Sequence, residues 1–224
     1  MIMWKSILYK EWLKLKWIFL IFTLLGIAVV SSIFLNVQHD FLFSGATNYW
    51  YSTLYMGLQY FSLLKYVPLV IGIAIGVAQY FPETVNKRIK LSFHLPINEN
   101  RLLILMMFCG TISLLLSFGA MFLLFWVLSS HFFPHEIVWA AIVSVTPWFL
   151  AGFAIYYLIS LIVLEPVWKY WILYGLMGYV IIGLYLESSV AGGFEPINLK
   201  FIVLTILFSL SSLFSAYRFR KGEM

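Results

Sequence analysis

Charged residues are scarce in this chain of 224 residues: Asp, Glu, Lys and Arg make up 10% of it, whereas hydrophobic residues make up 63%. A soluble globular protein needs more polar surface than this composition supplies. The composition therefore excludes an ordinary soluble domain and indicates a protein whose solvent is the lipid bilayer.

Two further absences restrict the chemistry of the chain. Cys109 is its only cysteine, which excludes an intrachain disulfide and a thiolate metal cluster. No glycine is followed by lysine, which excludes a P-loop that would cradle the phosphates of ATP. The longest polar interval, around residues 81–101, has room for only a short helix and a turn. We therefore expect no catalytic residues, cofactor or bound metal in this chain.

Long apolar runs are what the chain has in abundance. One crossing of a hydrocarbon core of about 30 Å takes roughly 20 apolar helical residues. The runs are apolar on every face, which favours helices over the alternating strands of a transmembrane barrel. We predict an all-α membrane protein that forms a single transmembrane domain over residues 1–224. Its six predicted transmembrane helices are 17–36, 56–80, 102–129, 137–163, 170–186 and 199–217.

The positions of the basic residues predict the orientation, because short cytoplasmic loops are enriched in Lys and Arg. With the N-terminus inside, only Lys65 and Lys200 of the fourteen basic residues fall on the outer side. Both termini are therefore predicted to be cytoplasmic, in a multi-pass protein of a cell membrane such as the bacterial inner membrane. The net charge of +5 is spread over separate inner segments, so we expect membrane lipids as partners and no nucleic acid.

The inner interval between the second and third spans has a helical pattern. Phe81, Val85 and Ile89 recur every four residues, and Glu83 precedes Lys87 in the favourable i,i+4 order. The pattern predicts a short amphipathic helix along the inner membrane surface. Such a helix could simply anchor the loop at the lipid boundary, or it could dock a cytoplasmic partner.

Prolines punctuate this interval at both ends. Pro82 suits the first turn of a helix, and Pro96 disfavours helix at the residue before it. The predicted helix therefore lies between these two prolines.

The N-terminal segment, residues 1–16, interleaves aromatic and basic side chains that suit a lipid boundary. Its helical wheel places Glu11 within the apolar arc that contains Ile7 and Leu15. Glu11 could pair locally with Lys14 or face a protein partner.

The order of these features resembles the membrane-spanning subunit of type-2 ATP-binding-cassette (ABC) exporters. The resemblance rests on the run Lys10-Glu11-Trp12-Leu13-Lys14-Leu15-Lys16 before the first span and on the Glu-led run from Glu83 to Lys90. It also rests on the run from Leu95-Pro96 to Arg101, which opens the third span, and on the six-span layout with both ends inside.

The resemblance implies a role for each of these segments. Residues 1–16 would be an interfacial elbow helix that contains Lys10, Glu11 and Lys14. Residues 82–92 would be the coupling helix that contacts a separate cytoplasmic ABC ATPase subunit. Its implied contact residues are Glu83, Val85, Lys87, Arg88, Ile89 and Lys90.

The resemblance also implies the composition of the transporter. Two permease subunits, identical or different, would form the path for a hydrophobic or amphipathic substrate, and two ATPase subunits would bind ATP and Mg²⁺. The outer loops of this chain are short for the family.

Three residues of the second span are candidates for the path or a subunit interface. Lys65 would either extend its ammonium outward to the lipid headgroups or face a polar cavity. Gly72 and Gly76 form a small-xxx-small pair that lets another helix approach, either in a second subunit or within the same one.

Five side chains predicted on the outer side carry ligand atoms that suit Zn²⁺: His39, Asp40, His131, His135 and Glu136. Pro134 lies between the two histidines of the later pair, and nothing fixes His39 near them. We therefore favour solvated outer loops.

Two other classes of function compete with the exporter subunit. A self-sufficient secondary transporter or channel would carry ionisable residues at the bilayer midplane, and the spans have almost none apart from Lys65. An intramembrane enzyme would need a cluster of catalytic groups at one depth.

Overall fold

The computed structural model describes residues 2–85, 99–165, 167–187 and 197–221, and within these ranges the chain forms helices joined by short connections, with no strand. This confirms the predicted all-α class. The elements are α1 (Ile2–Ser44), α2 (Ala46–Tyr55), the 3₁₀ turn η1 (Ser62–Leu64), α3 (Val67–Val85), α5 (Glu99–Phe132), α6 (His135–Leu164), α7 (Trp168–Leu186) and α8 (Asn198–Lys221).

Five helices of the described chain, α1, α3, α5, α6 and α7, are long and apolar enough to cross a membrane. In α8 the apolar stretch Asn198–Ser211 is shorter, so the sixth crossing stays a prediction. The helix ends agree within three residues with the spans predicted at 102–129, 137–163 and 170–186.

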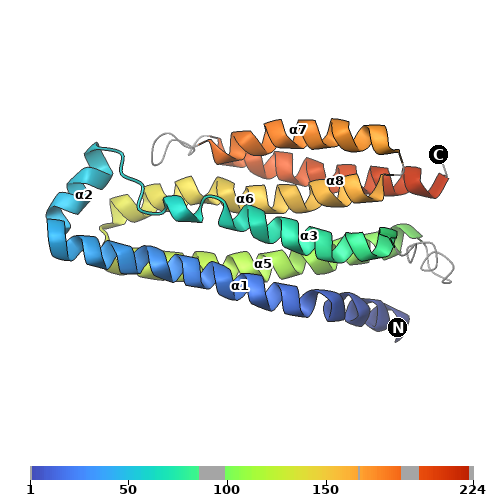
Figure 1. Ribbon diagram of the computed structural model, residues 1–224, viewed down its shortest axis with the longest axis horizontal. Coiled ribbons are helices and arrows are strands. Elements are labelled where there is room, and N and C mark those ends of the chain that lie inside the picture. The colour runs from blue at the N-terminus through green and yellow to red at the C-terminus, as the bar shows by residue number, and fades with distance from the viewer. Residues whose placement is uncertain (1, 86–98, 166, 188–196, 222–224) are drawn as a thin grey trace.

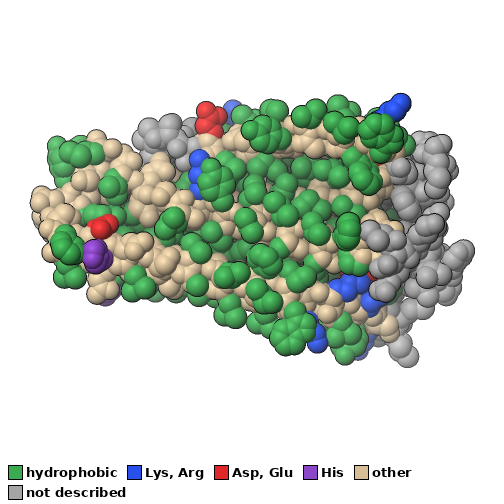
Figure 2. Space-filling model, in the orientation of Figure 1, with side chains coloured by type: hydrophobic (Ala, Val, Ile, Leu, Met, Phe, Trp, Pro, Cys, Tyr) green, Lys and Arg blue, Asp and Glu red, His purple; other side chains and the backbone are tan. Residues whose placement is uncertain are grey.

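The helices form an elongated bundle around α6 (Figure 1). Helix α6 packs against α3, α8 and α7, whereas α1 packs mainly against α5 and α3. This central position explains why α6 is apolar on all its faces. The visible face of the bundle is dominated by apolar side chains and carries few charged ones (Figure 2), as a surface that contacts lipid requires.

Both termini lie at one end of the bundle, together with the last turn of α3 and the first turn of α5 (Figure 1). Helix α2 lies at the other end. The chain thus returns to the same end where the sequence places its basic segments.

The predicted elbow helix is not a separate element, because residues 2–44 form one continuous helix of 43 residues. A helix of that length spans about 65 Å, roughly twice the hydrocarbon thickness, so it extends well beyond a membrane. The segment contains no proline, and its first turns are held by burial of Ile7, Glu11 and Leu15 against the bundle. The N-terminal segment is therefore continuous with the helix that contains the first predicted span.

The second span starts later than the predicted residue 56: its apolar helical stretch begins at Ser62 in η1, and α3 itself begins at Val67. Gly57 adopts a positive φ of 71°, a conformation that breaks a helix, and Pro68 fits the first turn of α3, where its missing N–H is not needed.

The same helix also continues further than predicted at its other end. We predicted that Pro82 begins a separate coupling helix, but Pro82 lies inside α3, which ends at Val85. The hydroxyl of Thr84 donates to the carbonyl oxygens of Phe81 (3.0 Å) and Tyr80 (3.3 Å), which satisfies acceptors in this last turn. The rest of the predicted coupling helix, residues 86–92, lies outside the described residues.

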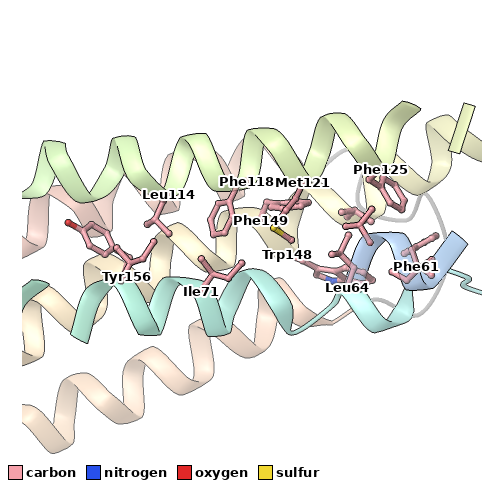
Figure 3. Packing of buried hydrophobic residues seen from close by; sticks show 14 of the residues in the cluster. Phe61, Leu64, Ile71, Leu114, Phe118, Met121, Phe125, Trp148, Phe149 and Tyr156 are labelled. Carbon is pink, nitrogen blue, oxygen red and sulfur yellow. The ribbon is translucent and has the colours of Figure 1, made fainter. Parts of the chain in front are cut away.

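The core is rich in aromatic rings toward the α2 end. The rings of Tyr60 and Phe133 stack with centroids 4.4 Å apart, and Phe61 contacts the fully buried Trp148 at 5.6 Å. Large side chains of α3, α5 and α6 interdigitate along the bundle, as Figure 3 shows for Ile71, Phe118 and Phe149. This packing fixes the register of the helices that carry the polar residues described next.

Candidate functional site

Glu11 is the starting point of a buried polar cluster at the end of the bundle that holds the termini. Ile7, Glu11 and Leu15 follow one another at helical spacing on the inward face of α1, and Glu11 is only 1% exposed. A buried carboxylate is costly unless charged or hydrogen-bonding partners surround it. Its partners therefore determine how α1 meets the bundle.

Two lysines of α1 join Glu11 to the last turn of α3. Lys14 lies 2.7 Å from Glu11 Oε1 and also forms an ion pair with Glu83. The Nζ atom of Lys10 lies 3.0 Å from Oε1 of Glu83, the oxygen that Lys14 also contacts. Glu83 is only 1% exposed, so its charge faces the bundle. The predicted local pair of Glu11 with Lys14 is confirmed, and its extension to Glu83 was not foreseen.

Gln79 carries the cluster across to α5 and α6. Its Nε2 donates to Glu11 Oε2 at 3.2 Å and to the carbonyl oxygen of Met106 at 2.6 Å. Its Oε1 accepts a hydrogen bond from the hydroxyl of Tyr156 at 2.8 Å. The hydroxyl oxygen of Tyr80 lies 3.1 Å from the hydroxyl oxygen of Tyr156. Because Tyr156 donates its proton to Gln79, Tyr80 is the donor in the bond between the two tyrosines. Gln79, Tyr80 and Tyr156 are completely buried.

We call this set the four-helix polar cluster; its side chains are Lys10, Glu11, Lys14, Gln79, Tyr80, Glu83 and Tyr156. Its members come from α1, α3 and α6, and the backbone of α5 contributes the carbonyl of Met106. Two lysines balance two glutamates, so the cluster is formally neutral. A fully bonded network of this kind joins helices in a defined register.

Gly110 of α5 provides the space in which Gln79 meets Tyr156. A Cβ atom at Gly110 would collide with the Tyr156 hydroxyl and with Oε1 of Gln79. Gly119 of the same helix faces open space instead. The glycine at position 110 is thus needed for a contact between two other helices.

The coupling residues predicted from the sequence fall into two groups. Glu83 is described and points inward to Lys10 and Lys14. Val85 is the last residue of α3. Lys87, Arg88, Ile89 and Lys90 lie outside the described residues.

Gly72 and Gly76 face α6 of the same chain. A Cβ atom at Gly72 would collide with the carbonyl oxygen of Gly152, and one at Gly76 would lie 3.2 Å from Ile159. The small-residue pair therefore serves close packing of α3 on α6 within the chain.

Lys65 lies between η1 and α3 and is half-buried, with its Nζ 5.6 Å from the ring centroid of Tyr66. Lys65 precedes the first residue of α3, whereas Gly76 lies in the middle of α3 and the polar cluster lies toward its end.

The histidines considered as metal ligands lie on different elements. His131 lies in the last turn of α5, whereas His135 begins α6. Within the described ranges no three His, Cys, Asp or Glu side chains are grouped so that they could hold a metal ion.

Sequence reasoning missed Gln79, Tyr80, Gly110 and Tyr156. One signal was present: Gln79 is a polar amide within the apolar run of the second span, and such residues bond to neighbouring helices. Comparison of the chain with known protein families, curated proteins and solved structures finds no match.

Proposed function

We propose that this chain is the permease subunit of an ATP-driven ABC exporter. Two such subunits would surround the path of a hydrophobic or amphipathic substrate. Separate cytoplasmic ATPase subunits would bind ATP and Mg²⁺ and contact the segment around residues 82–92. The chain would span a cell membrane several times, with both termini in the cytoplasm.

The observation that carries this proposal is the attachment of Glu83 to Lys10 and Lys14. Glu83 is the first residue of the run that resembles a coupling helix, and the two lysines belong to the run that resembles an elbow segment. The two segments implicated by the resemblance are thus neighbours in space, although many residues separate them in sequence.

This geometry suggests how force would reach the membrane. Closure of the ATPase subunits would push on residues 82–92 and hence on the last turn of α3. Because Glu83 is paired with α1, and Gln79 is bonded to α5 and α6, displacement of that turn would move several helices together. The substrate path could then change the side to which it opens.

Purification in mild detergent from the cells that produce the protein tests the proposal. A nucleotide-binding ATPase should copurify with the tagged chain in a two-to-two ratio, measured by native mass spectrometry. The double variant Lys87→Glu/Arg88→Glu should lose the ATPase while still inserting into the membrane. Lys200→Glu, a change in an exposed lysine at the start of α8, should retain it. Absence of any ATPase from the unaltered protein would contradict the proposal.

The alternative is a self-sufficient secondary transporter, which the buried carboxylates of Glu11 and Glu83 favour because buried acids can bind protons. The two acids lie near the end of the bundle, however, and both are paired with Lys14. Substrate uptake by the purified chain in proteoliposomes, driven by a proton gradient without ATP, would establish this alternative and refute the exporter.

A further inference from the structure

An apolar groove runs between α1 and α3 on the surface of the bundle. Phe22, Leu25 and Val29 line it from α1, and Tyr66, Val67 and Val70 line it from α3, around a cavity of about 280 Å³. Gly26 also lines the groove, and a Cβ atom there would collide with Met121 of α5 beneath it. The groove opens outward, since Leu25 and Val70 are both about half exposed.

The side chain of Lys65 lies at one end of this groove. The Nζ of Lys65 lies 5.6 Å from the ring of Tyr66, which is itself one of the lining residues. No salt bridge joins Lys65 to an acidic residue in the part of the chain that the structure describes. Among the described residues, Lys65 thus has a positive charge without an acidic partner.

The position of Lys65 matches the depth of a lipid headgroup. Helix α3 has 19 residues, a length of about 28 Å that corresponds to one crossing of the hydrocarbon core. Lys65 lies two residues before this helix, near the start of the apolar stretch Ser62–Thr84 that is long enough to cross a membrane. We therefore expect its ammonium near the edge of the hydrocarbon and the groove further inside.

We propose that the groove between α1 and α3 binds one acyl chain of an anionic phospholipid whose phosphate contacts Lys65. The apolar lining provides a surface for the chain, and the unneutralised ammonium selects a negatively charged headgroup. A hydrophobic helix of a second copy would cover the lining but would leave the charge of Lys65 without a partner. This site is independent of the exporter function, because it requires only that the chain is embedded in a membrane.

Photolabelling of the purified protein tests the site. The protein is placed in nanodiscs that contain phosphatidylcholine together with phosphatidylglycerol carrying a diazirine on its acyl chain, and the labelled peptides are mapped by mass spectrometry. We expect adducts on the groove-lining residues of α1 and α3. Phosphatidylcholine with the same diazirine should label them less.

Two matched pairs of variants distinguish the contribution of the groove to lipid binding from the contribution of the charge. Val70→Trp fills the groove and should abolish the adducts, whereas Val77→Trp, on the same face of α3 but outside the groove, should not. Lys65→Gln should lower labelling by phosphatidylglycerol about fivefold, the effect of one lysine at an anionic headgroup. Lys200→Gln should leave the labelling unchanged. Leu25→Trp, which fills the groove from α1, replaces Val70→Trp if that variant does not fold.

The proposal is overturned if both lipids label the groove equally, or if labelling survives in the variants that fill it. Crosslinks to a second copy of the chain in place of lipid adducts would overturn it as well.

Discussion

The ammonium of Lys10 lies 3.0 Å from the carboxylate of Glu83, which joins the N-terminal part of α1 to the last turn of α3. Lys14 reaches the same carboxylate from one turn further along α1. The end of the second span is therefore attached to the first helix at the place where a cytoplasmic partner is expected to act.

The two ion pairs of Glu83 should differ in strength. Lys14 is 16% exposed and should couple to Glu83 by ~2 kcal/mol in a double-mutant cycle with Lys14→Gln and Glu83→Gln. Lys10 is 46% exposed, so solvent screening should hold its coupling to Glu83 below ~1 kcal/mol. Unfolding free energies in detergent measure both values. Equal couplings would mean that burial does not control these pairs.

Gly110→Ala should destabilise the protein by ~2 kcal/mol, because the added methyl group pushes Gln79 and Tyr156 apart and leaves buried polar groups without partners. Gly119→Ala, in the same helix but facing open space, is the control and should be neutral or slightly stabilising. Thermal unfolding in detergent compares them. A Gly110→Ala protein as stable as the control would rule out the close contact described.

Gly72→Ala should also be destabilising, by ~1–3 kcal/mol, since the added Cβ meets the backbone of Gly152 and forces α3 away from α6. Gly183→Ala on α7 meets nothing and should change the unfolding free energy by less than ~0.5 kcal/mol. If Gly72 instead mediated contact between subunits, Gly72→Ala would weaken association and leave the unfolding of the separated chains unchanged.

The orientation can be tested by labelling introduced cysteines in a Cys109→Ser background. Asn86→Cys directly follows α3 and should react with a membrane-impermeant maleimide only after intact cells are permeabilised. Thr47→Cys lies on an exposed position of α2 at the opposite end and should react in intact cells. The reverse pattern would place the termini outside.

The helices were predictable because the apolar runs alone fix where a chain can cross a membrane. Residues 102–129 and 137–163 correspond closely to α5 and α6 for this reason. The continuity of α1 is not predictable from composition, because the change from mixed to apolar residues near Trp17 resembles a boundary between two elements. The composition changes near Trp17, but residues 1–25 contain no proline or glycine that would end the helix.

The polar cluster could be predicted only in part. Glu11 and Lys14 are local neighbours, so their pairing follows from helical spacing. The partners of Gln79 depend on the relative register of α3, α5 and α6, and that register results from many apolar contacts, including the close approach at Gly110 and at Gly72. Periodicity within one helix carries no information on such contacts between helices.

We propose that a separate ATPase contacts the segment after α3, and photocrosslinking in cells at Arg88 is a direct test of this contact. A photoreactive amino acid at this position should form an adduct with a nucleotide-binding ATPase, identified by mass spectrometry, whereas the same residue at Lys200 should not. Adducts at position 88 that contain lipid or other proteins but no ATPase would contradict the account.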